Sequence, residues 1–200
     1  MDDLAAITPP ASLAEIERRT AAFGFPMPSE RLTGALLRAL AAAKPGGQLL
    51  ELGTGTGLAT AWMLDGMDSR ATLVTVDIDP GAQAIARALL GTDPRLTIVT
   101  EDAAAFLARL TASGIAGAGG GFDLIFADAM IGKYEMLDET LALLRPGGFY
   151  LIDDMLPQAS WPEGHAPKVP HLLATLAARP DLRLATLAWS SGVAVAVRRG

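Results

Sequence analysis

The stretch that decides the fold is Gln48–Gly57, QLLELGTGTG, in which a short apolar run leads into a glycine-rich turn. The run Gln48–Leu52 has the length and composition of a buried strand, and Leu58–Leu64 after the turn has helical character. Glycines at such a turn permit a sharp bend and let a ligand approach the backbone. The order strand, glycine turn, helix predicts the first unit of an α/β sheet with a ligand site at the turn.

Strands and helices alternate along the rest of the chain. Further strands are predicted at residues 71–76, 95–100, 122–127 and 148–152, and helices at 80–90, 102–110, 134–144 and 165–178. Two final strands, 182–189 and 193–198, flank a Ser-Ser-Gly turn as in a hairpin. We therefore predict an α/β fold, a Rossmann-like seven-stranded doubly wound sheet with an antiparallel last strand and helices on both faces.

Residues 1–47 precede this alternation and are predicted to form a helical arm. One helix is expected over 13–23 and a second from an N-cap at Ser29 to about residue 43, where Lys44-Pro45-Gly46-Gly47 ends it. Residues 48–200 then form the main domain, and the two parts make one compact whole.

Composition excludes several classes of protein. The 200 residues contain no Cys, which excludes a disulfide scaffold, a thiolate zinc site and a cysteine nucleophile. A net charge of −6 and a pI of 4.9 argue against binding of nucleic acid. The apolar runs are too short for a membrane span and the acidic start Met1–Leu4 is wrong for a secretory signal, so we expect a cytoplasmic protein.

The glycine turn has the spacing E-x-G-x-G-x-G, which differs from the G-x-G-x-x-G of nicotinamide enzymes. Glu51, two residues before the first glycine, suits a positively charged ligand such as S-adenosylmethionine, which carries a sulfonium and an amino group. Asp77 ends the second strand, where ribose hydroxyls are bound in such folds. Asp102 follows the third strand and either accepts from an adenine amino group or caps the next helix.

Four stretches point to a family when they are taken together. They are Met27–Glu30 (MPSE), Leu50–Gly57 (LELGTGTG), Phe122–Ala129 (FDLIFADA) followed by Tyr134, and Leu144–Gly148 (LRPGG) followed by Ile152–Leu156 (IDDML). In this order they resemble the class I S-adenosylmethionine-dependent methyltransferases, and within that class the catechol and caffeoyl-CoA O-methyltransferase family. The resemblance covers residues 48–200.

The resemblance implies a cofactor site and a metal site. The predicted cofactor-binding residues are Met27, Glu51, Gly53, Thr54, Gly55, Gly57, Asp77, Ile78, Asp102, Ala103 and Asp128. Family members hold a divalent metal, usually magnesium, at positions that correspond to Asp128, Asp153 and Asp154. Oxygen ligands suit Mg²⁺ or another hard cation, which would bind two neighbouring acceptor oxygens and lower the pKa of a phenol. Asp153 and Asp154 could instead cap local backbone.

Two departures from the family concern catalysis. The family has a catalytic lysine three residues after the fourth-strand aspartate, where this chain has Ile131, and Lys133 follows two residues on. His165 could replace that lysine as general base, or could merely belong to the start of the next helix. Asp154 stands where the family has asparagine. The predicted catalytic residues are therefore Asp128, His165 and Lys133.

These observations predict an S-adenosylmethionine-dependent methyltransferase that methylates an oxygen of a small, catechol-like acceptor with divalent-metal assistance. Two alternatives stay open. One is a metal-independent methyltransferase with a nitrogen or carboxylate acceptor, and the other is a cofactor-binding module without catalysis. The resemblance also implies a homodimer formed through the N-terminal arm.

Overall fold

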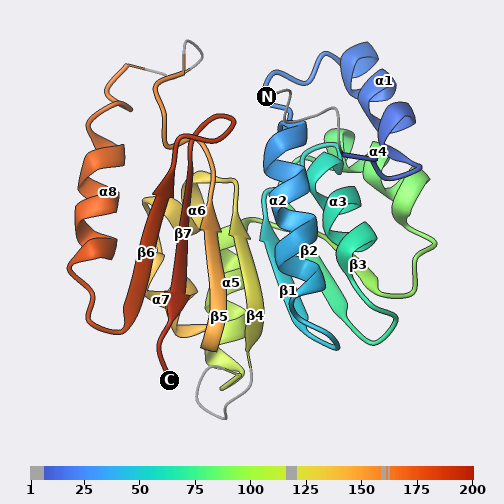
Figure 1. Ribbon diagram of the computed structural model, residues 1–200. Coiled ribbons are helices and arrows are strands. Elements are labelled where there is room, and N and C mark those ends of the chain that lie inside the picture. The colour runs from blue at the N-terminus through green and yellow to red at the C-terminus, as the bar shows by residue number, and fades with distance from the viewer. Residues whose placement is uncertain (1–6, 116–120, 159–160, 162) are drawn as a thin grey trace.

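The computed structural model describes residues 7–115, 121–158, 161 and 163–200. Its centre is a seven-stranded sheet in the order β3-β2-β1-β4-β5-β7-β6 (Figure 1). The strands are β1 (Gln48–Leu52), β2 (Thr72–Asp77), β3 (Leu96–Thr100), β4 (Phe122–Ala127), β5 (Leu144–Ile152), β6 (Leu182–Leu187) and β7 (Val193–Arg198). Strands β1 to β5 pair in parallel, and β7 lies antiparallel between β5 and β6. The predicted α/β fold with an antiparallel last strand is confirmed.

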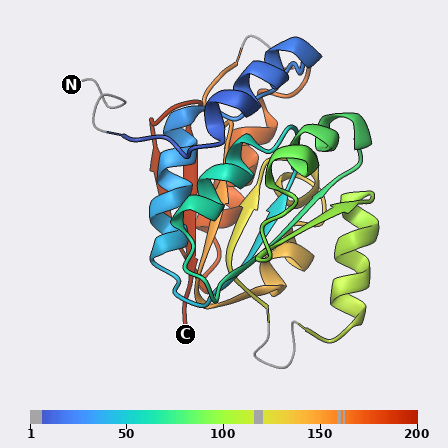
Figure 2. The ribbon, with the colours of Figure 1, turned by 90° about the vertical axis from the view of Figure 1, so that its right-hand side faces the viewer.

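Helices cover both faces of the sheet, as the view turned by 90° shows (Figure 2). They are α1 (Leu13–Phe23), α2 (Arg31–Ala42), α3 (Leu58–Gly66), α4 (Pro80–Leu90), α5 (Ala103–Ala112), α6 (Met130–Lys133), α7 (Leu137–Ala142) and α8 (Lys168–Ala177). Apolar side chains of α1 to α4 form a core on one face, and those of α5, α7 and α8 form a second core on the other. Because both faces are covered, the strands are apolar along most of their length.

The described part of the N-terminal arm belongs to the main core. Leu13 and Ile16 of α1 and Leu37 of α2 are fully buried in the same cluster as residues of β1 and β2. The hydroxyl of Thr20 in α1 also donates to that of Thr56 in the glycine turn at 2.7 Å. The arm therefore supports the turn that follows β1. Residues 1–6 of the predicted arm lie outside the described residues.

The strand order reverses at β1, whose two neighbours are β2 and β4. Leu52 at the end of β1 is level with Val76 of β2 and with Ala127 of β4. The loops that leave these three strands therefore meet at one edge of the sheet. A reversal of this kind is the place where open α/β sheets bind ligands.

Some predicted boundaries are wrong. Ser29 is not the N-cap of α2, because Glu30 occupies that position. The predicted helix 134–144 is shorter, since Met136 has a left-handed φ of 53° that precedes α7, and β5 already begins at Leu144. The helix predicted from residue 165 begins at Lys168.

Within the described ranges, none of the helices combines the length and the apolar character that crossing a lipid bilayer requires.

Candidate cofactor and active site

The glycine turn after β1 is built from backbone conformations that favour glycine. Gly53 has a φ of 102° and Gly57 a φ of 94°. A Cβ on Gly53 would lie 2.6 Å from the backbone oxygen of Asp128, and a Cβ on Gly57 would lie 2.7 Å from the Cβ of Ala86. The turn is therefore pressed between the β4 loop and α4. The ring of Phe25 lies against its outer side, 3.1 Å from where a Cβ of Gly55 would be.

Asp77 at the end of β2 fixes the tip of this turn. Its Oδ2 accepts the backbone N–H of Gly55 at 2.8 Å, and its Oδ1 accepts that of Asp79 at 3.0 Å. Hydrogen bonds to a charged acceptor are stronger than those between neutral groups. Asp77 is half-buried, and the neighbouring Ile78 is 69% exposed, which is unusual for a large apolar residue. The pair therefore presents a carboxylate and an apolar surface beside the glycine turn.

Glu51 is the most unusual acid of the site because it is fully buried in β1. Its Oε2 accepts the hydroxyl of Thr60 at 2.5 Å, and its Oε1 is buried without a hydrogen-bond partner among the described residues. The pKa of Glu51 is raised to about 8, mainly by burial and to a smaller extent by the nearby carboxylates of Asp128 and Asp77. A buried acceptor without a partner costs free energy. A ligand that brings a donor or a positive charge would relieve this cost.

Thermal stability should reflect this raised pKa. An unfolded glutamate ionises near 4.5, whereas Glu51 in the folded chain ionises near 8, so the unfolded state loses its proton first as the pH rises. The contribution to the free energy of unfolding is then lost between those two pH values. We expect Glu51→Gln, which keeps an acceptor for Thr60, to reduce the fall in Tm between pH 5 and pH 8, measured by circular dichroism. An equal fall in both proteins would contradict this role.

The remaining predicted cofactor residues lie around the same edge. Thr54 is buried, and its hydroxyl is hydrogen-bonded to that of Thr75 at 2.7 Å. Met27, in the segment between α1 and α2, is 69% exposed. Asp102 caps α5 by accepting the N–H of Ala105 at 3.0 Å, and Ala103 is the first residue of that helix. The capping alternative for Asp102 is confirmed, and its contact with an adenine stays a prediction.

Asp128, directly after β4, connects the glycine turn to the rest of the site. Its backbone N–H donates to the carbonyl of Leu52 at 2.8 Å, which joins the ends of β4 and β1. Its Oδ2 accepts the hydroxyl of Ser29 at 2.9 Å, and its Oδ1 lies 3.5 Å from Nζ of Lys133. The serine that was predicted to cap α2 thus reaches across to the end of β4.

Lys133 occupies the interior of the site. Its side chain is 6% exposed, and Nζ lies 3.6 Å from Oδ2 of Asp154 as well as near Asp128. Ile131, at the position of the family's lysine, packs instead against the second core. Gly132, with a φ of 90°, turns the chain between the two residues. The side chain of Lys133 therefore points back towards Asp128, although Lys133 comes two residues after the position of the family's lysine.

Asp153 and Asp154 follow β5 and differ in exposure. Asp153 is 3% exposed, and its Oδ1 accepts the hydroxyl of Ser191 and the N–H of Asp154. The pKa of Asp153 is raised to about 7, mainly by burial and next by the Asp128 carboxylate. Burial also raises the pKa of Asp154, against the attraction of Lys133. Asp154 has a left-handed φ of 64°, which asparagine and aspartate adopt more readily than most residues and which suits either at this position.

The three aspartates do not fit a divalent cation as they are arranged. No three His, Cys, Asp or Glu side chains within the described ranges are grouped so that they could hold a metal ion. An ammonium group lies instead within ion-pair distance of Asp128 and Asp154. The metal set of Asp128, Asp153 and Asp154 stays a prediction. The ammonium of Lys133 lies among the carboxylates that would hold the metal.

His165 belongs to an aromatic group beside these charges. Its Nε2 lies 3.2 Å from the hydroxyl of Tyr134, and its ring centroid lies 4.7 Å from that of Trp161. Burial, followed by the charges of Lys168 and Lys133, lowers the pKa of His165. The lowered pKa favours the neutral imidazole, the form that can accept a proton. His165 lies three residues before the start of α8, where its carbonyl accepts the N–H of Lys168 at 2.9 Å, and its role as a base stays a prediction.

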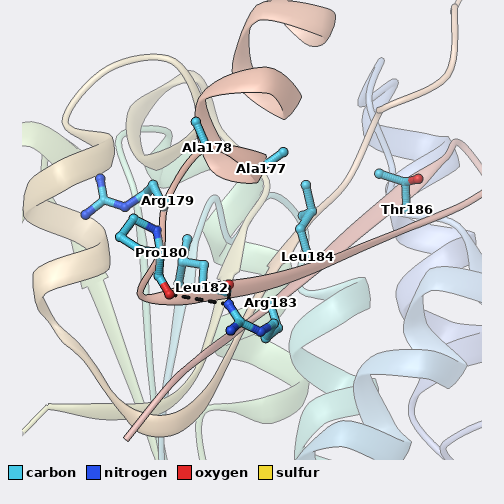
Figure 3. A pocket seen from close by; sticks show the side chains of 8 residues that line it. All are labelled: Ala177, Ala178, Arg179, Pro180, Leu182, Arg183, Leu184 and Thr186. Atoms are coloured by element: carbon cyan, nitrogen blue, oxygen red, sulfur yellow. Dashed lines mark hydrogen bonds between the residues drawn. The ribbon is translucent and has the colours of Figure 1, made fainter.

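Two hollows of the surface lie away from these residues. One of 510 Å³ is formed by the end of α8 and the start of β6, where Arg183 donates to the backbone oxygen of Pro180 (Figure 3). Another of 630 Å³ lies between α2 and the end of β6. None of the predicted site residues lines either hollow. The titratable side chains of the candidate site lie at the carboxyl edge of the sheet instead.

Sequence reasoning missed several residues that support the site. Ser29 and Ser191 hydrogen-bond Asp128 and Asp153, Thr60 hydrogen-bonds Glu51, and Phe25 lies on the glycine turn. Ser29, Ser191 and Phe25 are far in sequence from the residues they contact, and Thr60 lies in the helix after the glycine turn. No short sequence motif therefore marks these residues. The one available signal is the Ser-Ser-Gly turn before β7, which places a hydroxyl level with the end of β5.

Comparison with known proteins gives the family. The profile of the family described as "Methyltransferase domain" matches residues 50–155, which is more than half of the chain. The chain belongs to this methyltransferase-domain family, and the resemblance seen in the sequence is confirmed. The match includes the glycine turn, Asp128 and both acids after β5.

Individual relatives agree with this assignment. A Mycobacterium avium protein named "Putative O-methyltransferase" is 35% identical over 125 residues, which are 60% of this chain and 53% of that protein. The chain thus spans about half the length of the curated relatives it matches. A cofactor-bound structure of Rv0187 from MTB has a TM-score of 0.82 at 25% identity, covering 98% of this chain and 94% of the other. The Bacillus cereus O-methyltransferase in complex with SAH, at 22% identity and a TM-score of 0.82, covers the same shares and shares the fold.

Proposed function

We propose that this chain is an S-adenosylmethionine-dependent methyltransferase that methylates an oxygen of a small, catechol-like acceptor. The observation that carries the proposal is the buried Oε1 of Glu51, which has no partner among the described residues and belongs to the strand that leads into the glycine turn. This buried oxygen suits a cationic ligand that carries an amino group. Membership of the methyltransferase-domain family supports the same reading.

Different residues at the carboxyl edge would bind different parts of this cofactor. Gly53, Gly55 and Gly57 leave the backbone of the turn open to close contact, and Asp77 would accept hydrogen bonds from the ribose. Ile78 and Met27 are exposed apolar side chains that would cover the adenine. The cofactor supplies an electrophilic methyl group on a sulfonium. The cation would favour the ionised form of Glu51, whose carboxylate would then balance part of the positive charge.

The acceptor would lie on the other side of Asp128, beside Lys133 and His165. The methyl group passes from sulfur to the acceptor oxygen, and the hydroxyl proton must leave that oxygen. His165 is the proposed base because its lowered pKa favours the neutral imidazole, which can accept that proton. Lys133 would hold the acceptor oxygen through its ammonium group, and Tyr134 would orient the imidazole of His165 through its hydroxyl. Alignment of the reacting atoms supplies much of the rate in such transfers.

Transfer of a labelled methyl group tests this proposal. We expect the wild-type chain to methylate a catechol such as 3,4-dihydroxybenzoate, and His165→Ala to reduce turnover by about 100-fold or more, as loss of a general base does. Binding of S-adenosylhomocysteine should be unchanged in this variant. His171→Ala, which changes the chain's other histidine, is the control. Equal turnover in His165→Ala and wild type would overturn the role of His165, and the absence of transfer to any hydroxyl acceptor would overturn O-methylation.

A second candidate function is metal-independent methylation of a nitrogen or a carboxylate. The position of Lys133 supports it, because an ammonium between two aspartates could pair with an acceptor carboxylate. Including benzoates and aromatic amines without hydroxyl groups in the same assay separates the two candidates. The homodimer and the cytoplasmic location inferred from the sequence stay predictions.

A further inference from the structure

The buried ammonium of Lys133 is the feature from which the inference starts. Lys133 is 5% exposed, and burying a lysine is costly unless its charge is compensated. Compensation comes from two carboxylates, with Asp128 Oδ1 at 3.5 Å and Asp154 Oδ2 at 3.6 Å. Nζ therefore lies in the space that a cation shared by these two acids would need.

The backbone holds this lysine in place. Gly132 has a φ of 90°, and a Cβ there would lie 2.6 Å from Cδ1 of Leu52, so the turn is packed against β1. Its N–H donates to the carbonyl of Glu135 at 2.7 Å, and its own carbonyl accepts the buried hydroxyl of Tyr150. These contacts fix the position from which the side chain of Lys133 leaves the backbone.

Two further oxygens of the group also have hydrogen-bond partners. Ser29 donates to Oδ2 of Asp128, and Oδ1 of Asp153 accepts two donors. A divalent cation needs carboxylate oxygens at about 2.0–2.6 Å and would have to replace these partners. It would also lie close to an ammonium, which repels it strongly in a partly buried site.

We propose that Lys133 is the resident cation of the three-aspartate group, so that the chain works without a divalent metal, and that removing this lysine creates a divalent-cation site. Its ammonium attracts both carboxylates and so keeps Asp128 and Asp154 on either side of Nζ. The inference goes beyond the proposed function, since it concerns what balances the acids and does not depend on which acceptor is methylated.

Titration with Mn²⁺, followed by the electron paramagnetic resonance of the free ion, tests the proposal. We expect wild type to leave Mn²⁺ free at concentrations at which Lys133→Met binds one equivalent, a difference of about tenfold or more in affinity. Adding Asp128→Asn to Lys133→Met should abolish the new site. Lys168→Met, which removes the neighbouring lysine over the ring of Tyr134, should behave like wild type.

Two results would overturn the inference. The first is stoichiometric Mn²⁺ binding by wild type that Asp128→Asn removes, and it needs no lysine variant to fold. The second is folded Lys133→Met, shown by its circular dichroism, that binds Mn²⁺ no better than wild type. Each protein is also titrated with S-adenosylhomocysteine. Normal binding of this ligand alongside either result would show that the inference fails while the proposed function stands.

Discussion

Replacing Asp77 by alanine is expected to weaken the binding of S-adenosylhomocysteine by roughly 10- to 100-fold. The carboxylate holds the N–H of Gly55 at 2.8 Å and is the proposed partner of the ribose hydroxyls. Hydrogen bonds to a charged group contribute about 1.5–3 kcal/mol, which corresponds to this change in affinity. Isothermal titration calorimetry of wild type and variant at the same pH measures the effect.

Asp79→Ala is the matched control for this experiment. Asp79 lies two residues on in the same loop, but its carboxylate caps α4 by accepting the N–H groups of Gly81 and Ala82. Its loss should lower stability by about 1 kcal/mol and leave affinity nearly unchanged. Equal losses of affinity in both variants would show that Asp77 acts only through the general shape of the loop.

Gly53→Ala is expected to have the largest effect on stability, a loss of about 2–5 kcal/mol in the free energy of unfolding. Alanine is strained at a φ of 102°, and its Cβ would lie 2.6 Å from the backbone oxygen of Asp128. That oxygen cannot retreat easily, because the N–H of Asp128 is bonded to the carbonyl of Leu52 at 2.8 Å. Urea unfolding followed by circular dichroism measures the change.

The control separates strain from contact. Gly147 also has a positive φ, of 75°, but no described atom lies within 4 Å of a Cβ placed there. Gly147→Ala should therefore cost about 1 kcal/mol, the contribution of backbone strain alone. If Gly53→Ala were no more destabilising than this control, the close approach of β4 to the glycine turn would be refuted.

The fold was predictable because its determinants are local. Each strand is a short apolar run followed by a polar turn, and Gln48–Leu52 and Phe122–Ala127 are β1 and β4 at the predicted bounds. Boundaries failed where tertiary contacts decide them. Ser29 has the right type for an N-cap, but its hydroxyl bonds Asp128 across the site. The helix expected from Tyr134 is interrupted because Met136 adopts a left-handed φ.

The candidate site was predictable at the strand ends and less so beyond them. Glu51, Asp77 and Asp128 follow from their positions at the ends of β1, β2 and β4, which a parallel sheet brings to one edge. The position of Lys133 does not follow from spacing, since the φ of Gly132 decides where its side chain points. The raised pKa of Glu51 also depends on burial, which a motif alone does not reveal.

The most direct test of the account is a calorimetric titration of the wild-type chain with S-adenosylhomocysteine at pH 7. The account predicts saturable binding of one molecule per chain, because the glycine turn, Asp77 and the unpartnered oxygen of Glu51 form one site. No heat of binding, in a protein shown by circular dichroism to be folded, would contradict the assignment of this edge of the sheet as a cofactor site.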